Sequence, residues 1–213
     1  MPTLQITEIF YSLQGETRTS GFPTVFIRLT GCPLRCHYCD TEYAFTGGKT
    51  LELAEILATV KQHQAKYITV TGGEPLAQKE CLTLLTMLCD LGYEVSLETS
   101  GAISLIGVDP KVCIVMDIKT PASGEADKNL WGNLQYLKPN DQIKFVICDR
   151  DDYSWMKTIA NAHDLYRLCE ILVSPSFEEI DHRELANWIL EDKLPVRYQL
   201  QLHKLLWNDE PGR

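Results

Sequence analysis

Short apolar runs rich in β-branched residues alternate along the chain with longer amphipathic stretches. The apolar runs predict strands at residues 24–29, 67–71, 93–98, 113–118, 142–148, 169–173 and 196–202. The amphipathic stretches predict helices at residues 51–60, 79–91, 151–162 and 177–190. Strands that alternate with helices at this spacing indicate βαβ units, a mostly parallel sheet and right-handed crossovers. Chemistry in such folds gathers at the carboxyl ends of the strands, so we expect the functional motifs there.

Two of the predicted helices carry end signals in the sequence. Thr50 precedes the helix at 51–60 and is a candidate N-cap. The helix at 79–91 repeats leucine every three residues, and Gly92 follows it where a glycine ends a helix. The sequence therefore predicts where the first of these helices starts and where the second ends.

Length, composition and charge place the chain among ordinary globular proteins. Its 213 residues suggest a single domain at 1–213, and 45% hydrophobic with 23% charged residues exclude a disordered or fibrous chain. Twenty basic against 29 acidic residues give a net charge of −9, which argues against a nucleic-acid or anionic-membrane partner. The start lacks a secretory pattern, and no apolar run approaches the ~20 residues that span a bilayer. We therefore expect a cytoplasmic protein.

Eight cysteines stand out in this composition. In a reducing compartment cysteines serve as metal ligands, redox groups or small buried side chains. Three of them, Cys32, Cys36 and Cys39, fall at C-x3-C-x2-C directly after the strand at 24–29. Thiolates hold iron–sulfur clusters, and this spacing lets one loop wrap around a compact cluster. Three ligands for a four-iron cube leave one iron open, as catalytic metal sites do.

Two other interpretations of the triplet remain open at this stage. A zinc site could use the three thiolates together with His37. Short zinc motifs, however, usually pair two C-x2-C units across a longer loop. Three unrelated core cysteines are the second alternative, although the neighbouring Arg35 and Asp40 make the loop too polar for a core.

Polar motifs follow the next two predicted strands. Residues 72–75 read Gly-Gly-Glu-Pro, where the glycines permit close backbone approach and Glu74 could receive an ammonium group. Residues 98–101 read Glu-Thr-Ser-Gly after the following strand. A plain glycine turn and a polar loop are the respective alternatives. Both motifs lie where a ligand would meet the sheet.

Charged residues at three positions point to the same edge of the sheet. Asp117 and Lys119 end the strand at 113–118, which suits a ligand-facing rim, although an ion pair that merely caps the strand is also consistent. Arg28 alternates in phase with Phe26, and an arginine that faces the interior requires an anion such as a carboxylate. A solvated arginine on the outer face is the alternative.

With these residues in place, the chain resembles a known superfamily. The cysteine triplet with an aromatic residue before its last cysteine, together with Gly-Gly-Glu-Pro, resembles the radical S-adenosylmethionine (SAM) superfamily. Further motifs resemble one family within it, the 7-carboxy-7-deazaguanine synthases of queuosine and 7-deazapurine biosynthesis. They lie at residues 9–16, 25–29, 39–41, 71–75, 98–101, 117–119, 144–147 and 201–204.

The resemblance implies a fold, a reaction and a set of partners. The fold would be α/β, a partial and modified (β/α)6 radical-SAM barrel, and the enzyme a homodimer. The reaction would convert 6-carboxy-5,6,7,8-tetrahydropterin to 7-carboxy-7-deazaguanine with loss of ammonia. A 4Fe–4S cluster, regenerated SAM and Mg²⁺ would serve as cofactors, and a flavodoxin-like protein would donate electrons.

The resemblance also implies roles for individual residues. Thr41 would bind Mg²⁺, and the three triplet cysteines would bind the cluster and generate the radical. Cofactor-binding positions would be Tyr38, Cys39, Asp40, Gly73, Glu74, Gly101, Asp117, Lys119 and Ser174. Substrate-binding positions would be Leu13, Gln14, Gly15, Glu16, Arg28, Thr99 and His203.

Two alternative functions are compatible with parts of this pattern. An activase of a glycyl-radical enzyme shares the triplet and the small size, but it needs a protein-docking surface in place of a pterin pocket. A non-enzymatic zinc-binding module would need only the cysteine loop. The motifs outside the triplet favour the synthase.

Overall fold

The strands of the computed structural model join into one sheet, and the structure describes residues 2–177, 179–208, 210 and 212. The strand bounds are β1 Thr3–Leu13, β2 Pro23–Leu29, β3 Lys49–Glu52, β4 Tyr67–Gly72, β5 Glu94–Thr99, β6 Cys113–Asp117, β7 Gln142–Ile147, β8 Glu170–Pro175 and β9 Arg197–Tyr198. Within the described residues their order is β3-β1-β2-β4-β5-β6-β7-β8-β9. β1 pairs antiparallel with β2 and β3, whereas every pairing from β2 through β9 is parallel. This is the mixed, mostly parallel sheet of a partial barrel, as predicted.

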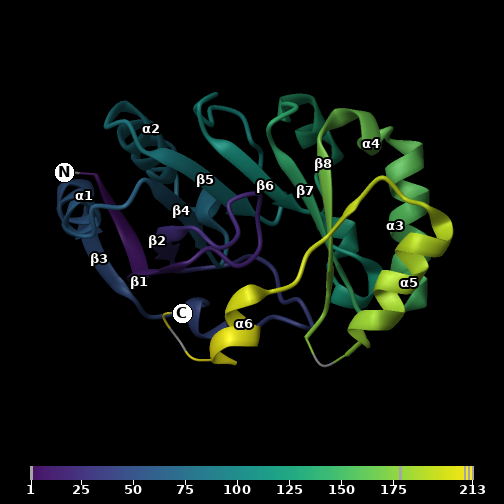
Figure 1. Cartoon of the computed structure of the whole chain (residues 1–213). Helices are drawn as coiled ribbons and strands as arrows, with labels where there is room; N and C mark the ends of the chain where they lie inside the picture. Colours follow the sequence, from purple (N-terminus) through teal and green to yellow (C-terminus); the bar gives the residue numbers. More distant parts are fainter. Residues whose placement is uncertain (1, 178, 209, 211, 213) are drawn as a thin grey trace.

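Helices cover the outer face of the sheet (Figure 1). Their bounds are α1 Leu53–Gln62, α2 Cys81–Asp90, α3 Arg150–Ala162, α4 Leu165–Leu168, α5 His182–Asp192 and α6 Leu202–Trp207. Short 3-10 helices lie at Glu42–Ala44, Pro75–Ala77, Pro121–Ser123, Ala126–Lys128 and Trp131–Tyr136. α1 and α2 lie beside the strands at one end of the sheet, and α3, α4 and α5 lie at the other. Among the described helices, none combines the length and the apolar character that crossing a membrane requires.

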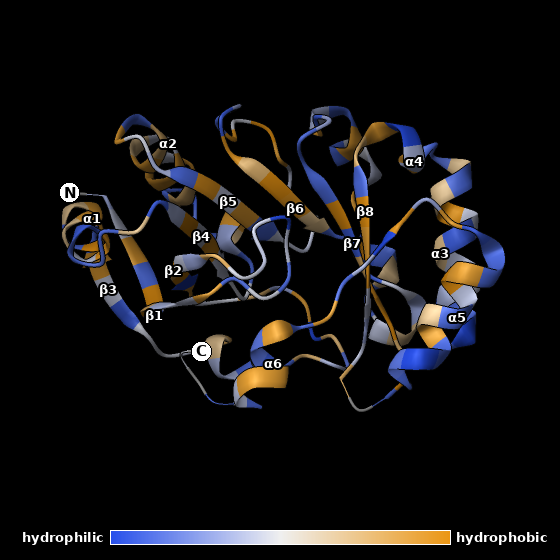
Figure 2. Ribbon diagram, in the orientation of Figure 1, coloured by the Kyte–Doolittle hydropathy of each residue, from blue (hydrophilic) through white to orange (hydrophobic). Residues whose placement is uncertain are grey.

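Alternation along the parallel strands separates an apolar outer face from a polar inner face. The outward-facing Val25, Ile27, Ile68 and Val70 are fully buried beneath the helices. Each buried aliphatic side chain of this size stabilises the fold by about 1.5–3 kcal/mol. Inward positions on the parallel strands include Arg28, Thr69, Thr71, Ser96 and Glu98, so the strands appear banded in blue and orange (Figure 2). The polar interior is therefore available for a site.

The helix predictions are confirmed in type and corrected at several ends. α2 closes as expected, since the Gly92 and Tyr93 amides bond back to the Cys89 and Leu88 carbonyls. The predicted N-cap Thr50 is wrong: it lies in β3, and Glu52 caps α1 through a capping box. The predicted helix at 177–190 begins only at His182, because Asp181 accepts two amide hydrogen bonds as its N-cap.

The sheet differs from the prediction at both ends of the chain. β1 and β3 were not predicted, and they add an antiparallel edge. The strand predicted at 196–202 is mostly wrong, since only Arg197–Tyr198 pairs with β8. Beyond it the Gln199 side chain and the Leu202 amide both donate to the Gly15 carbonyl. The chain therefore leaves the sheet to close over the β1–β2 loop and continues into α6.

Candidate active site

A cavity of about 410 Å³ lies at the carboxyl ends of the parallel strands. This volume falls within the range of small-molecule sites. It is lined by sixteen of the predicted site residues: Leu13, Gln14, Gly15, Glu16, Arg28, Cys32, Cys36, Tyr38, Cys39, Asp40, Thr41, Gly73, Thr99, Asp117, Lys119 and His203. Residues that are far apart in the sequence thus meet at one place.

The loop after β2 brings the three triplet cysteines to one wall of this cavity. All three thiols are free and half-buried. Burial raises the pKa of each thiol, and burial together with the neighbouring Asp117, Cys39 and Cys32 raises the pKa of Cys36 to about 11. Bound metal would displace these protons, because thiolate is the ligand form.

The side-chain geometry favours a cluster over a single ion. Within the described part of the chain, no three His, Cys, Asp or Glu side chains converge closely enough to hold one metal ion. His37 is 77% exposed and its Nε2 lies 3.8 Å from Glu179 Oε1, outside the cavity wall. A four-iron cube takes its thiolates at three separate corners, so it accepts ligands that are spread more widely. The cysteine loop therefore fits an iron–sulfur cluster better than a zinc ion.

Gly73 lets the end of β4 lie directly against the cysteine loop. A Cβ atom at this position would lie 2.4 Å from the Gly31 carbonyl oxygen and 2.8 Å from Cys32 Cβ. The Glu74 amide then donates to the same Gly31 carbonyl at 2.8 Å. Only glycine permits this approach, which fixes where the first thiol is held.

Asp117, Lys119 and Tyr38 form a second group beside the cysteines. Lys119 Nζ lies 3.0 Å from Asp117 Oδ2 and 5.7 Å from the centre of the Tyr38 ring. Burial opposes its charge, but Asp117 and Tyr38 raise the pKa of Lys119 overall. Asp117 Oδ1 and the Tyr38 hydroxyl are buried without a hydrogen-bond partner. Unsatisfied buried polar atoms on a cavity wall are the groups that a polar ligand would pair with.

The facing wall is built from the β1–β2 loop, β7 and α6. Glu16 forms an ion pair with Lys144 of β7, accepts from Gln201 Nε2 at 3.1 Å and lies 4.0 Å from His203 Nε2. Burial would raise the pKa of Glu16, yet Lys144 and His203 lower it overall. Burial lowers the pKa of His203, although Glu16 opposes this. At neutral pH this wall therefore carries a charged carboxylate beside a neutral imidazole.

Gly15 allows α6 to lie against the β1–β2 loop. A Cβ atom here would lie 2.5 Å from His203 Nδ1. The Gly15 carbonyl also accepts from the Leu202 amide at 3.2 Å. The absence of a side chain at this position thus allows the close contact with His203.

A polar network continues along the inner faces of the neighbouring strands. Gln14 Nε2 donates to Glu98 Oε1 at 3.2 Å and to Thr69 Oγ1 at 3.1 Å, and the Thr71 hydroxyl donates to Glu98 Oε2 at 3.0 Å. Among the described residues, Glu98 has no ion-pair partner. Burial and the charge of Glu16 raise the pKa of Glu98.

Arg28 lines the cavity, as its phase with Phe26 predicts. Its Nε donates to Glu8 Oε1 at 2.7 Å, and the Tyr43 hydroxyl donates to the same oxygen at 2.8 Å. Glu8 therefore supplies the anion that an inward arginine requires, and it holds the plane of the guanidinium.

Three predicted residues do not reach the cavity wall. Glu74 is fully buried, and its carboxylate accepts from the Thr99 and Ser100 hydroxyls and from the Ser100 and Leu76 amides. The Ser174 hydroxyl is buried without a partner, and the Gly101 carbonyl accepts from Asn133 Nδ2. The Glu74 oxygens hold the loop after β5 in place, and a ligand contact of Glu74 stays a prediction.

Several lining residues had no predicted role. Five of them lie within the quoted motifs: Thr71, Glu98, Lys144, Gln201 and Lys204. Inward phase on β4, β5 and β7 was the available signal for the first three. Gln201 lies within the segment predicted as a strand at 196–202, and Lys204 follows that segment, so the start of α6 between them gave no signal in the sequence.

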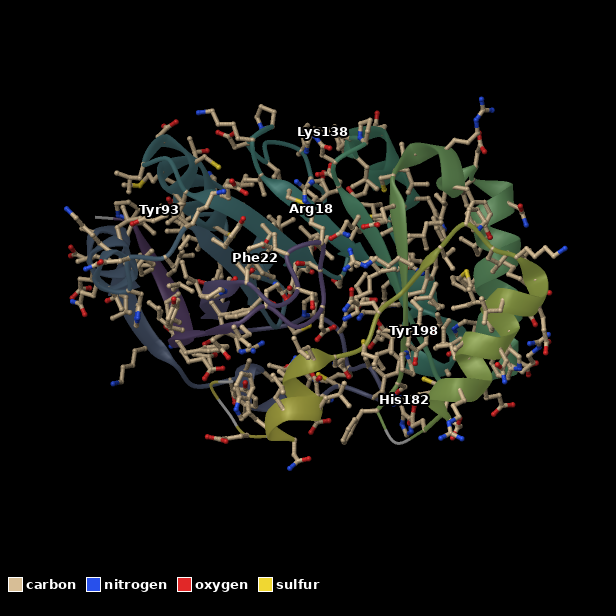
Figure 3. The ribbon with its side chains drawn as sticks, viewed as in Figure 1. Arg18, Phe22, Tyr93, Lys138, His182 and Tyr198 are labelled. Atoms are coloured by element: carbon tan, nitrogen blue, oxygen red, sulfur yellow. The ribbon has the colours of Figure 1, made fainter. Side chains whose placement is uncertain are left out.

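A second, smaller hollow of about 230 Å³ lies at the amino ends of the strands. Figure 3 shows Arg18, Tyr93 and Lys138 on this side, away from α6. It also shows Tyr198 next to His182, where the tyrosine hydroxyl donates to the His182 carbonyl at 3.2 Å. The hollow is smaller than typical ligand sites and holds none of the predicted residues.

Known proteins resemble the chain over nearly its whole length. The 7-carboxy-7-deazaguanine synthase of Koribacter versatilis is 42% identical over 97% of this chain and 98% of that relative. The synthase of Chlorobaculum tepidum is 43% identical over 97% of this chain and 96% of its own length. The chain belongs to the 7-carboxy-7-deazaguanine synthase family.

Broader comparisons agree with this family. The sequence profile of the Radical SAM superfamily matches residues 26–110. The fold is similar to the crystal structure of QueE from Escherichia coli, with a TM-score of 0.79 and 22% identity over 94% of this chain and 95% of that one. Membership of this radical SAM family implies a 4Fe–4S cluster and SAM.

Proposed function

We propose that the chain converts 6-carboxy-5,6,7,8-tetrahydropterin to 7-carboxy-7-deazaguanine with loss of ammonia. One observation carries this proposal: a single cavity is lined by the three triplet cysteines together with Gln14, Glu16 and Arg28. The relatives at 42% and 43% identity are named for synthesis of this product.

Cys32, Cys36 and Cys39 would hold the cluster, and their loop would keep it at the cavity wall. When bound, the cluster and SAM supply a one-electron route to a carbon-centred radical. The chain's own contribution is binding and orientation. Asp117 and Tyr38 each offer an unpaired buried oxygen for the polar groups of SAM, and Lys119 holds Asp117 in place.

The pterin acid would bind to Arg28, Glu16 and Glu98. The Arg28 guanidinium suits a carboxylate, because its planar fork donates two parallel hydrogen bonds. Glu16 and Glu98 accept hydrogen bonds and would pair with N–H groups at the edge of the heterocycle. Gln14, which already donates to Glu98, would fix that carboxylate in the plane of the ring.

Thr41 would be the protein ligand of Mg²⁺. Its hydroxyl donates to Asp40 Oδ1 at 2.8 Å, so two oxygen donors stand together at the cavity edge. Mg²⁺ prefers oxygen ligands and keeps several waters, so one or two protein donors suffice when the substrate completes the shell. The ion would neutralise charge on the substrate acid.

The Thr41→Ala variant tests the magnesium proposal. We expect Mg²⁺ stimulation of turnover to fall about tenfold, because the hydroxyl ligand is gone, while the cluster absorbance stays unchanged. Titration of activity with Mg²⁺ after chelator treatment measures it. Loss of the cluster itself would contradict this role for Thr41.

Two partners complete the proposal. A flavodoxin-like protein would deliver electrons to the cluster, and two copies of the chain would form a homodimer. Reduction of the cluster by purified flavodoxin and sedimentation at micromolar concentration test these points separately.

The decisive experiment is a product assay under anaerobic conditions. Reduced, cluster-loaded protein is incubated with SAM, Mg²⁺ and the carboxypterin, and mass spectrometry detects 7-carboxy-7-deazaguanine. Abundant 5′-deoxyadenosine without that product would favour the activase. One zinc per chain without iron or sulfide would overturn the radical proposal altogether.

A further inference from the structure

Lys144 is a buried cation on the cavity wall that the proposed chemistry leaves without a task. It lies at the centre of β7 on the inner face, where its side chain is 15% exposed. Its neighbours Ile143 and Phe145 lie on the opposite, helix-covered face of the sheet, where they are fully buried in the hydrophobic core. A lysine in this position is costly unless it is paired, because burial removes the hydration of its charge.

The partner of this cation is Glu16, whose carboxylate is held at both oxygens. Oε2 pairs with Lys144 Nζ, and Oε1 accepts from Gln201 Nε2 at 3.1 Å. The Glu16 amide donates in turn to Gln14 Oε1 at 2.9 Å. The carboxylate is thus fixed from β7, from the start of α6 and from its own loop.

Glu16 would lose its charge readily without Lys144. The Asp40 carboxylate raises the pKa of Glu16, and Glu16 in turn raises the pKa of Glu98 on β5, a further carboxylate in the same cavity. His203 on α6 also lowers the pKa of Glu16, but less than Lys144 does. Asp117 of β6 pairs with Lys119 and adds a further negative charge near Lys144. Lys144 is therefore the main source of positive charge for Glu16.

We propose that Lys144 is a positioning residue for substrate binding, which keeps Glu16 charged and oriented to accept N–H donors of the heterocycle. This inference rests on the proposed function, in which Glu16 binds the pterin. A protonated Glu16 would turn an O–H donor toward the N–H donors of the heterocycle, and two donors do not form a hydrogen bond. The role of Lys144 is thus indirect, through the carboxylate.

Lys144→Met tests this inference, because methionine keeps the length of the side chain and removes the charge. We expect the Kd of the carboxypterin for cluster-loaded protein to rise roughly ten- to hundredfold, as for loss of a hydrogen-bonded charge. Equilibrium binding without reductant measures it, so turnover is not required. The kcat of the variant should stay within about threefold of the parent, because the residue acts on binding.

The pH dependence of binding separates positioning from simple packing. Between pH 6 and 8 the parent should bind with constant affinity, whereas the Met variant should gain affinity as pH rises, because removal of Lys144 raises the pKa of Glu16. Lys144→Arg keeps the charge and should restore a flat profile. Flat profiles for parent and Met variant alike would overturn the inference. Lys144→Gln decides by the same profile if the Met variant fails to fold.

A double substitution separates indirect from direct action. With Glu16→Gln in place, Lys144→Met should change the Kd less than threefold, because the charge it serves is gone. If the two substitutions instead raise the Kd by independent factors that multiply in the double variant, Lys144 contacts the substrate itself and the inference is overturned. Lys157→Met breaks an outer ion pair with Asp192 and serves as the matched control. Product formation by the parent, measured alongside, reports separately on the proposed function.

Discussion

Single side chains decide how tightly the two walls of the cavity are joined. Gly73 and Gly15 each permit a contact that a methyl group would block, one with the cysteine loop and one with α6. Glu98 reduces the stability of the fold, because its buried carboxylate has no ion-pair partner among the described residues. Binding determinants here reduce the stability of the empty protein, as preorganised sites often do.

Gly73→Ala should displace the cysteine loop. The added methyl group would meet the Gly31 carbonyl and Cys32 Cβ, which are backbone and near-backbone atoms that cannot rotate away. We expect about 1–3 kcal/mol of destabilisation and less iron per chain after anaerobic reconstitution. Gly132→Ala is the matched control, because nothing lies within 4 Å of a Cβ atom there. Equal iron content in both variants would contradict the role of Gly73.

Glu98→Gln should stabilise the fold at neutral pH. Burial and Glu16 raise the pKa of Glu98, so the native state binds its proton more readily than the unfolded chain does. That contribution to stability is present below about pH 4.3 and is lost as pH rises through the native pKa. Glutamine does not titrate, so the variant keeps its stability as pH rises. The difference in the free energy of unfolding between variant and parent should therefore grow from pH 4 to pH 7. Denaturant unfolding across this range measures it, and a constant difference would refute the assignment.

At the scale of elements, α6 closes the cavity although it is only one and a half turns long. Lys204 Nζ lies 3.1 Å from Asp40 Oδ2, and Gln201 Nε2 donates to both Glu16 and Asp40. One short helix therefore links the cysteine loop to the β1–β2 loop. Its stability comes from these contacts, since a helix of six residues does not form by itself.

Gln201→Ala should loosen this link without disturbing the cluster. Loss of two hydrogen bonds to carboxylates costs about 1–2 kcal/mol, which corresponds to a roughly tenfold higher KM for the carboxypterin. Steady-state kinetics measures it, with iron content as the check on the cysteine loop. Gln135→Ala, which removes an exposed amide bonded to the Gly132 carbonyl, is the control. A lower kcat at constant KM would place Gln201 in the reaction instead.

The elements also show where the sequence was informative. The parallel strands and their order of polar and apolar positions could be predicted, because buried strands repeat every two residues and are bounded by turns. The α6 segment could not, because apolar Leu200 and Leu202 suit a strand, whereas long-range contacts with Gly15, Glu16 and Asp40 hold the chain outside the sheet. Thr50 fails as a cap for a similar reason, since pairing with Gln5 of β1 keeps it extended.

At the scale of the whole molecule, the site was predictable because its residues follow consecutive strands. Cys32, Gly73 and Asp117 come from three different segments and meet because carboxyl ends of parallel strands share one edge. Glu74 lies at the same edge, but its side chain does not line the cavity. Proximity to the edge does not fix the direction of a side chain, and its oxygens were taken by Thr99 and Ser100.

Ligand binding should stabilise the molecule as one unit. At a hundredfold excess over Kd, SAM contributes about 2.7 kcal/mol to cluster-loaded protein, which raises Tm by about 5–10 °C. We expect one calorimetric transition, because the predicted single domain at 1–213 has one sheet. Cluster-free protein should shift much less. Two transitions, or equal shifts with and without the cluster, would contradict this expectation.

Thr17 and Val115 line both hollows of the interior, so the partition between them is only one side chain thick. A substitution in this partition would change which substrates the cavity accepts. Trimming Val115 to alanine would deepen the reaction chamber toward the opposite mouth while sparing every proposed ligand. We expect this variant to accept a pterin acid with a longer substituent, and the same product assay with such a substrate would measure it.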